Sequence, residues 1–308
     1  MIKKAIITAA GKGTRQYPAT NAVQKEMFPL VDRDGIAKPT IQIIVEEALN
    51  AGIEEIAIIV QPGEENQFVQ HFNGLKDREK SAFANKPWGL EQSDLLDRMQ
   101  DAIVYRHQTE QFGFGHAVYC AHDFVGDDPV LLMLGDHVYV SHSNISCAQQ
   151  LLQAYENCQK SIFSVQQTPA EELYLFGTVA GKPIDDAHNL YELNRIEEKP
   201  SIDYARKNMQ TPGLKDDMFF TIFGMYLLTP NLFSVLKKNI SQNKCERGEI
   251  QLTTALAELL QIEGAYGLEM SGSRLDMGTP LGYLQTQLAL ASRSTYAEAL
   301  ASYYEKIK

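Results

Sequence analysis

The sequence carries little positive charge, with 28 Lys and Arg residues against 39 Asp and Glu residues among 308. Its formal net charge of -11 at pH 7 would repel nucleic acids and anionic membrane surfaces, so we expect neither as a main partner. No apolar run approaches the roughly 20 residues that cross a bilayer. The start of the chain also lacks the cleavage pattern of a signal peptide, so we expect no membrane segment and no leader.

Cysteine is scarce as well, and the chain shows no metal-binding or disulfide spacing at Cys120, Cys147, Cys158 and Cys245. Scattered cysteines of this kind fit a reducing compartment, and we expect cytoplasmic localisation. Internal repeats and low-complexity linkers are missing, so no sharp domain boundary can be drawn. At 44% hydrophobic residues the chain can still bury a large core.

A glycine-bearing loop follows the first apolar run of the chain. The run Ala5-Ile6-Ile7 leads into AAGKGTR at 9–15, whose small residues leave backbone N–H groups accessible to a phosphate. Five cations precede the first acidic residue, Glu26; they are Lys3, Lys4, Lys12, Arg15 and Lys25. A positive island on an acidic protein predicts a polyanionic ligand.

Two well-known phosphate loops do not fit this segment. A Walker A loop needs Lys after its last glycine, whereas Gly13 is followed by Thr14 and Arg15. The dinucleotide fingerprint needs a third glycine where Gln16 stands. Taken alone, the loop therefore fits either a phosphate cradle or a tight strand exit with incidental charges.

Strand and helix patterns alternate along the first half of the chain. Strands are predicted over 2–8, 56–60, 130–134 and 161–166, with one helix opening at Pro39 and another over about 145–155. This rhythm predicts an α/β fold with a doubly wound, mainly parallel, Rossmann-like sheet. Ligands of such sheets bind beyond the carboxyl ends of the strands, where the loop at 9–15 and Asp136 both lie.

The second half is less regular. A strand is predicted over 218–228, and helices are predicted to open at Pro230, to cover 249–261, and to run from Pro280 toward the end with breaks. The polar segment 73–100 contains the single tryptophan, Trp88. It is predicted to be an inserted segment that forms either a lid or part of an interface.

Ten short motifs, in order from residue 5 to about 290, resemble those of the sugar nucleotidyltransferases, and within them the bacterial-type UTP–glucose-1-phosphate uridylyltransferases. The motifs are AAGKGTR at 9–15, PAT at 18–20, KEMFPL at 25–30, VEEA at 45–48, AGIEEI at 51–56, GFGHAV at 113–118, GD at 135–136, EEKP at 197–200, GEIQLT at 248–253 and DMGT at 276–279. The resemblance implies a catalytic domain over 1–290, with an insertion at about 73–100, and a C-terminal helical tail over 291–308. It also implies a homodimer or homotetramer, with the C-terminal helices as contacts.

The implied reaction is attack of a hexose-1-phosphate oxygen, that of glucose-1-phosphate or a close relative, on the α-phosphorus of UTP. The attacking phosphate is already ionised, so the reaction needs cations and a metal rather than a general base. The resemblance assigns residues as follows: catalytic Arg15, Lys25 and Lys199; nucleotide-binding Ala9, Ala10, Gly11, Lys12, Gly13, Gln108 and Gly113; sugar-binding Gly177, Glu198 and Lys199; and Mg²⁺ ligands Asp136 and Asp276. The less specific alternatives are solvated surface cations and carboxylates that cap turns.

Several positions depart from the family pattern: Asn21 replaces a lysine, Gln24 a proline, His137 an acid, Met225 an arginine and Thr279 an acid. The departures at Asn21, His137 and Met225 motivate a second hypothesis, a non-catalytic paralogue that binds a nucleotide sugar and modulates a partner enzyme.

A thymidylyltransferase is a further alternative. A glycosyltransferase is disfavoured because Asp136-His137-Val138 is not an Asp-x-Asp motif. His137 and His142 beside Asp136 also permit a transition-metal site, although two histidines and an acid are a weak signal and a hydrogen-bonded histidine beside the site is the favoured interpretation. His116 is predicted to be structural.

Overall fold

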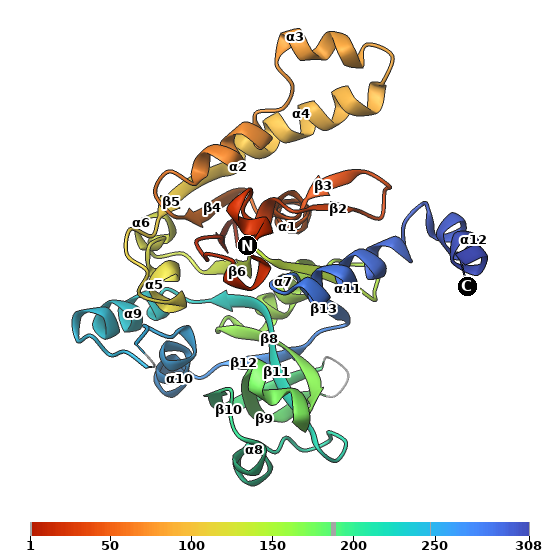
Figure 1. The fold of residues 1–308 in the computed structure, drawn as a ribbon. Helices are drawn as coiled ribbons and strands as arrows, with labels where there is room; N and C mark the ends of the chain where they lie inside the picture. Colours follow the sequence, from red (N-terminus) through yellow and green to blue (C-terminus); the bar gives the residue numbers. More distant parts are fainter. Residues whose placement is uncertain (1, 186–188, 247, 308) are drawn as a thin grey trace.

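A mixed sheet of nine strands forms the centre of the computed structural model, which describes residues 2–185, 189–246 and 248–307 (Figure 1). The strands lie in the order β5-β4-β1-β6-β11-β8-β12-β10-β9. Their bounds are β1 Lys4–Thr8, β4 Glu55–Val60, β5 Ile103–His107, β6 Val130–Leu134, β8 Ile162–Pro169, β9 Gly177–Asp185, β10 Leu190–Glu198, β11 Met218–Leu228 and β12 Tyr266–Glu269. Two small antiparallel sheets pair β2 (Pro29–Val31) with β3 (Ala37–Pro39), and β7 (His137–Ser141) with β13 (Gly272–Asp276).

The strands β5, β4, β1 and β6 form a parallel half of the sheet. The apolar residues of β1 and β4 and those of β6 from Val130 to Met133 are buried, as expected for strands covered by helices on both faces, whereas those of the edge strand β5 are mostly half-buried. The predicted strands 130–134 and 218–228 have the bounds of β6 and β11. The strand predicted over 2–8 begins later, at Lys4, and the one predicted over 161–166 extends to Pro169.

The other half of the sheet corrects the prediction of a mainly parallel arrangement. Strand β11 is antiparallel to both β6 and β8, and β10 is antiparallel to both β12 and β9. Only β12 and β8 are parallel there. The chain between the ends of β9 and β10 is far shorter than the dozen or so residues that a parallel crossover needs, so these two strands must run in opposite directions.

Helices cover both faces of the sheet, as the doubly wound prediction requires. Alternate residues of β1 point to opposite sides: Ile6 packs with α5, α9 and α10, whereas Ile7 packs with α1, α2 and α7. The helices are α1 Thr40–Asn50, α2 Glu65–Phe72, α3 Asp77–Lys80, α4 Pro87–Ala102, α5 Phe114–Tyr119, α6 His122–Val125, α7 Cys147–Cys158, α8 Ile202–Asn208, α9 Asn231–Ser241, α10 Leu252–Glu263, α11 Pro280–Ala291 and α12 Ala297–Ile307. The helix predicted over 249–261 thus begins only at Leu252.

Two parts of the chain stand apart from the sheet (Figure 1). The segment 73–100 forms α3, a short 3-10 helix and most of α4, which packs on α2. The C-terminal helical pattern breaks after Ala291, and α12 lies at the periphery. Nothing in the packing fixes the predicted boundary at residue 290, which stays a prediction. In the described part of the chain, no helix combines the length and the apolar character needed to cross a membrane.

Candidate active site

The loop after β1 presents a row of free backbone amides. Strand pairing ends at Ala9, whose N–H donates to the Ile59 carbonyl at 2.8 Å. The amides from Ala10 to Gly13 find no hydrogen-bond partner among the described residues. Gly13 closes the loop in the left-handed region, with φ of 60°, which favours glycine. Successive free N–H groups of this kind form a binding site for an anion.

Lys25 crosses beneath this loop to reach the end of β6. Its Nζ lies 2.6 Å from Oδ2 of Asp136 and 3.6 Å from Oε1 of Glu26. A side chain at Gly11 would have its Cβ 3.4 Å from the Lys25 Nζ, and a Cβ at Gly135 would lie 2.6 Å from the Thr8 carbonyl oxygen. Glycine at these two positions therefore lets the loop, the lysine and the strand end approach one another.

A cavity of about 280 Å³ opens beside this pair, and we call it the Lys25 cavity. Its lining includes Ala10 and Gly11 of the loop, and also Gln108 and Gly113. The buried Gln108 side chain donates from Nε2 to the Gly113 carbonyl at 3.0 Å, which leaves its Oε1 as a free acceptor in the described structure. Gly113 has φ of 100°, and a Cβ there would meet Glu249 at 2.6 Å. The left-handed backbone and the tight packing against Glu249 therefore both require glycine at this position.

Asp276 ends β13 and enters the site from the far end of the chain. Its Oδ1 accepts from the Gly278 N–H at 2.7 Å and lies 3.7 Å from Nε2 of His137. The guanidinium of Arg15 lies directly against Gly278, so that a Cβ there would overlap it. Gln16 fixes this arrangement, since its Nε2 donates to the Met277 carbonyl at 2.7 Å. The first loop and the last strand therefore meet at one place.

The charges of this cluster reinforce one another. Burial would lower the pKa of Lys25, but Asp136 and Glu26 raise it above its ordinary value. Burial would raise the pKa of Asp136, yet Lys25 and His137 hold it below the usual range. The pKa of Asp276 is likewise lowered, because His137, the Gly278 N–H and Arg15 outweigh burial. Both carboxylates are therefore ionised at neutral pH, beside two cations.

A second cavity, of about 240 Å³, lies around the end of β10, and we call it the Lys199 cavity. Lys199 follows β10 with a left-handed φ of 49°, a strained conformation for a residue with a side chain. Its N–H donates to the Phe176 carbonyl at 3.2 Å. Glu198 is held by Thr253, whose Oγ1 donates to Oε2 at 2.6 Å. A Cβ at Gly177 would lie 3.3 Å from the same Oε2, so a bound ligand can approach the backbone there.

Arg274 is a further cation of the Lys199 cavity. Its guanidinium lies 4.0 Å from the centre of the Phe176 ring, and Nη1 donates to the Ile222 carbonyl. Its Nε is buried without a hydrogen-bond partner in the described part of the chain, and burial lowers its pKa. No salt bridge neutralises this arginine within the described residues, so the cavity retains an unpaired positive charge.

The structure brings most of the predicted site residues together. The Lys25 cavity is lined by Ala10, Gly11, Lys25, Gln108, Gly113 and Asp136, and the Lys199 cavity by Arg15, Gly177, Glu198, Lys199 and Asp276. The two cavities adjoin, because Phe114 and Leu134 line both. Three predicted nucleotide-binding residues line neither cavity: Ala9 is buried, Gly13 forms the turn of the loop, and Lys12 is exposed.

The two histidines considered as metal ligands lie at opposite ends of β7. His137 faces Asp276, whereas His142 bonds through Nε2 to the Ser273 hydroxyl at 2.9 Å. No cluster of three or more His, Cys, Asp and Glu side chains suited to a metal occurs within the described ranges. Mg²⁺ needs only one or two protein carboxylates when phosphates and water complete its shell. Asp136 Oδ1 and Asp276 Oδ2, which have no partner among the described residues, fit such an ion.

Sequence reasoning did not single out several residues that line these cavities, notably Arg274, Glu26 and Phe114. One signal for Arg274 was available. It stands two residues before Asp276, and residues two apart on a strand share a face, so a strand over 272–276 would have placed both at one site. Glu26 and Phe114 directly follow the predicted site residues Lys25 and Gly113 within the motifs at 25–30 and 113–118, but the sequence assigned them no role.

Comparisons with known proteins identify relatives over nearly the whole chain. The nucleotidyl transferase family model matches residues 4–293. The UTP–glucose-1-phosphate uridylyltransferase 2 of Staphylococcus saprophyticus is 37% identical over 314 aligned residues, covering 100% of this chain and 98% of the relative. A crystal structure of a UDP-glucose pyrophosphorylase complexed with UDP-glucose matches with a TM-score of 0.74 and 28% identity, covering 94% of this chain and 98% of that one. The UTP-bound enzyme of Acinetobacter baumannii matches with a TM-score of 0.80 and 25% identity, with full coverage of both chains.

Proposed function

This chain belongs to the nucleotidyl transferase family, and we propose from that premise that it transfers the uridylyl group of UTP to glucose-1-phosphate. In this reaction a phosphate oxygen of glucose-1-phosphate forms a bond to the α-phosphorus of UTP. The bond between the α-phosphorus and the bridging oxygen breaks, and pyrophosphate leaves with that electron pair. The products are UDP-glucose and pyrophosphate. The enzyme class is that of a UTP–glucose-1-phosphate uridylyltransferase.

One observation carries the proposal: two adjoining cavities, each provided with cations, meet at the carboxyl ends of β1 and β6. Two anionic substrates must approach each other in this reaction, and their repulsion is a large part of the barrier. Lys25 and the free amides after β1 serve one anion, and Lys199 and Arg274 serve the other. No side chain needs to remove a proton, because the attacking phosphate is already ionised.

The Lys25 cavity is the proposed UTP site. The free amides of residues 10–13 would hold phosphate oxygens. Lys25, together with Arg15 from the adjoining Lys199 cavity, would neutralise charge on the α-phosphate and the departing pyrophosphate. The free Oε1 of Gln108 and the backbone at Gly113 would recognise the edge of the uracil ring. Because Lys25 is held by Asp136, it is already in place before the substrate arrives.

The Lys199 cavity is the proposed glucose-1-phosphate site. Glu198 is oriented by Thr253 and would accept hydrogen bonds from sugar hydroxyls. Gly177 would let the sugar approach the backbone. Lys199 and Arg274 would share the sugar phosphate, which compensates for the lack of a salt bridge at Arg274 among the described residues.

We also propose that the reaction requires Mg²⁺, held by Asp136 and Asp276. A bound Mg²⁺ supplies positive charge that neutralises the triphosphate. The two carboxylates are supported in this role by their lowered pKa values and by the free oxygen that each retains in the described structure. The reaction is proposed to take place in the cytoplasm, where Cys120, Cys147, Cys158 and Cys245, all free thiols in the structure, stay reduced.

A homo-oligomer is supported by exposed apolar residues on the last two helices. Leu281, Leu284 and Leu288 are 65%, 63% and 71% exposed and share one side of α11. On α12, Tyr303 and Ile307 repeat this pattern. Helical faces of this kind on a folded chain are typical of an interface. A second copy of the chain is the proposed partner.

The decisive experiment measures pyrophosphate release from each of the four nucleoside triphosphates with several sugar-1-phosphates. The proposal expects turnover with UTP and glucose-1-phosphate, and its loss when the metal is chelated. A chain that binds UDP-glucose but releases no pyrophosphate from UTP with any hexose-1-phosphate would instead be a non-catalytic paralogue. A clear preference for dTTP over UTP would identify a thymidylyltransferase.

A further inference from the structure

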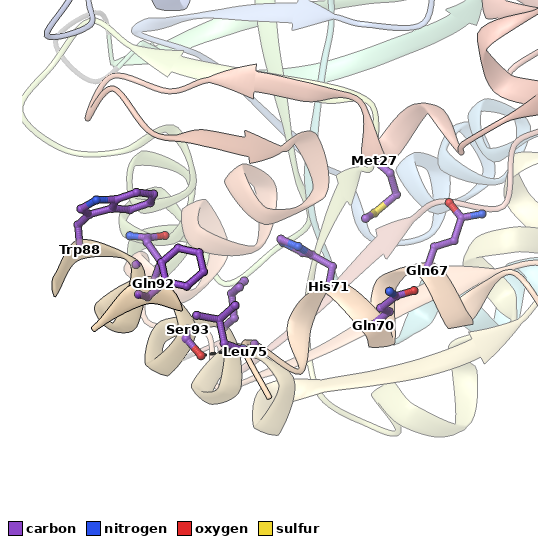
Figure 2. A pocket seen from close by; sticks show the side chains of 12 residues that line it. Met27, Gln67, Gln70, His71, Leu75, Trp88, Gln92 and Ser93 are labelled. Atoms are coloured by element: carbon purple, nitrogen blue, oxygen red, sulfur yellow. Dashed lines mark hydrogen bonds between the residues drawn. The ribbon is translucent and has the colours of Figure 1, made fainter. Parts of the chain in front are cut away.

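A further cavity lies between α2 and α4 (Figure 2), and we call it the Trp88 cavity. Its volume is about 560 Å³, within the range of roughly 300–1,000 Å³ that is usual for small-molecule sites. Neither α4 nor the segment before it lines the Lys25 or Lys199 cavity, so this cavity is separate from the proposed active site. Figure 2 shows Trp88 and Gln92 at one end of it and Met27 and Gln67 at the other.

The lining of the Trp88 cavity is uncharged and partly aromatic. Phe83 and Trp88 stand edge to face, with ring centres 6.2 Å apart, and Met27 and Leu96 add further apolar surface. Trp88 is 53% exposed, so the indole is available to a ligand. The lining includes no Lys, Arg, Asp or Glu, although the protein as a whole is strongly acidic. A neutral ligand with a flat apolar face fits this surface best.

Hydrogen bonding determines which ring nitrogen of His71, at the polar edge of the cavity, carries the hydrogen. Gln42 donates from Nε2 to Oε1 of Glu46 at 2.9 Å, so its Oε1 is the atom that faces His71 Nε2 at 3.0 Å. An amide oxygen only accepts, so His71 Nε2 carries the hydrogen and Nδ1 is an acceptor. Nδ1 has no partner among the described residues. Burial lowers the pKa of His71 to about 4, which keeps the ring neutral at physiological pH.

Other polar groups complement this acceptor. Gln92 accepts at Oε1 from Gln42 at 3.3 Å, which leaves its Nε2 free to donate. The side-chain amides of Gln67 and Gln70 make no hydrogen bonds within the described structure. The cavity therefore offers one fixed acceptor, one fixed donor and two adaptable amides around an indole. That set matches the edge of a nitrogen heterocycle that both donates and accepts.

We propose that the Trp88 cavity is a second ligand site, which binds the uncharged, flat base of a nucleoside against Trp88 with its polar edge toward His71 and Gln92. The inference goes beyond the proposed activity and does not depend on it. Stacking on Trp88 supplies apolar contact, and the two polar groups select rings with donor and acceptor atoms over plain aromatic hydrocarbons. Met27, at the cavity wall, belongs to the same short 3-10 helix as Lys25, so the two sites share an element.

Trp88 provides the test, because it is the single tryptophan of the chain. The full-length protein is titrated with adenosine and with uridine while Trp88 fluorescence is recorded. Neither nucleoside carries a phosphate, so neither can serve as a substrate of the proposed reaction. We expect saturable quenching, and a dissociation constant raised about tenfold both by His71→Phe and by Gln92→Leu. The matched control His122→Phe alters an exposed histidine on α6 and should leave binding unchanged.

Three results would overturn the proposal. One is the absence of any saturable change with both nucleosides. Another is equal binding of benzyl alcohol, or binding that ignores both His71→Phe and Gln92→Leu, since the cavity would then be a plain apolar groove. The third is a change in Trp88 emission with protein concentration alone, which would show a second copy of the chain in the cavity. Pyrophosphate release, measured on the same samples, reports separately on the proposed activity.

Discussion

The ammonium group of Lys25 lies 2.6 Å from a carboxylate oxygen of Asp136, between the loop after β1 and the turn after β6. The side chains are only 14% and 15% exposed, so each charge depends on the other to offset its loss of hydration. Under the proposed function the pair joins stability to catalysis: it would hold Lys25 ready for a phosphate and keep Asp136 ionised for a metal.

Removing the Lys25 side chain is expected to lower both the stability of the fold and the rate of the reaction. Lys25→Met leaves Asp136 buried without its cation, which should lower the free energy of unfolding by about 3 kcal/mol. The rate of pyrophosphate release should fall at least about a hundredfold, because one phosphate contact is lost. Urea denaturation and a turnover assay measure the two effects. The double variant Lys25→Met/Asp136→Asn should regain most of the stability and stay inactive; recovered activity would contradict the role of Lys25.

Glu26 gives a prediction on pH. Burial, followed in importance by the opposing effect of Lys25, sets its pKa to about 8 in the folded protein, against 4.5 ordinarily. Between these values the folded chain holds a proton that the unfolded chain releases, so this group makes stability fall as pH rises, by at most about 1.4 kcal/mol per pH unit. In Glu26→Gln this decline between pH 5 and 8 should be flatter. Unfolding curves at four pH values test it, with the exposed Glu91→Gln as the control. An unchanged slope in Glu26→Gln would refute the protonated state.

Lys199 should act on one substrate only. Lys199→Ala is expected to raise the KM for glucose-1-phosphate by about tenfold or more, because a charge-assisted contact is lost. The KM for UTP should change little. Steady-state kinetics with each substrate varied in turn separates the two. Lys207→Ala, on the exposed end of α8, is the matched control. An equal rise in both KM values would mean that Lys199 does not belong to the sugar side.

Arg274 is expected to join Lys199 in binding the sugar phosphate. Arg274→Met should raise the KM for glucose-1-phosphate about tenfold and spare that for UTP, and Arg274→Lys should restore part of the loss. The urea midpoint should move little, because the buried guanidinium lacks a carboxylate partner in the described structure and its removal relieves a desolvation penalty. A large loss of stability with unchanged KM values would show a purely structural residue.

The C-terminal helices should determine the oligomeric state. Leu284→Asp together with Leu288→Asp places two charges on the exposed apolar side of α11 and should convert an oligomer into a monomer. Light scattering coupled to gel filtration gives the mass directly. Gln285→Asp, on the same helix, is the control for added charge. A monomeric wild-type chain, or an oligomer that survives the double substitution, would exclude this face.

Much of the parallel half of the fold could be predicted from local sequence. The run Val130 to Leu134 is apolar throughout, and Gly135-Asp136 ends it. Both the strand and the candidate site residue at its end could therefore be predicted. The loop after β1 was recognisable for the same reason. Each of these features depends on residues next to one another in the chain, where periodicity and turn chemistry act.

In the antiparallel half, β8 and β11 were predicted as strands, but β9, β10 and the antiparallel pairing could not be predicted in this way. Strands β9 and β10 are half polar, and β10 exposes much of its length, so neither produces an apolar run. Their place in the sheet depends on pairing with β11 and β12, which are distant in the sequence. The contacts of Arg274 with Phe176 and Ile222 could not be predicted for a related reason, since these partners come from other elements. Contacts of this kind arise only from tertiary packing.

The hydrogen bond from Gln16 to the Met277 carbonyl joins two ends of the chain that are 261 residues apart. During synthesis on the ribosome, the loop after β1 can therefore form this hydrogen bond only after nearly the whole chain has been made. A nascent or truncated chain that stops before β13 can form the parallel strands yet has neither Asp276 nor the anchor for Arg15. Catalytic competence would thus appear in one late step of folding, and partial chains would not consume UTP.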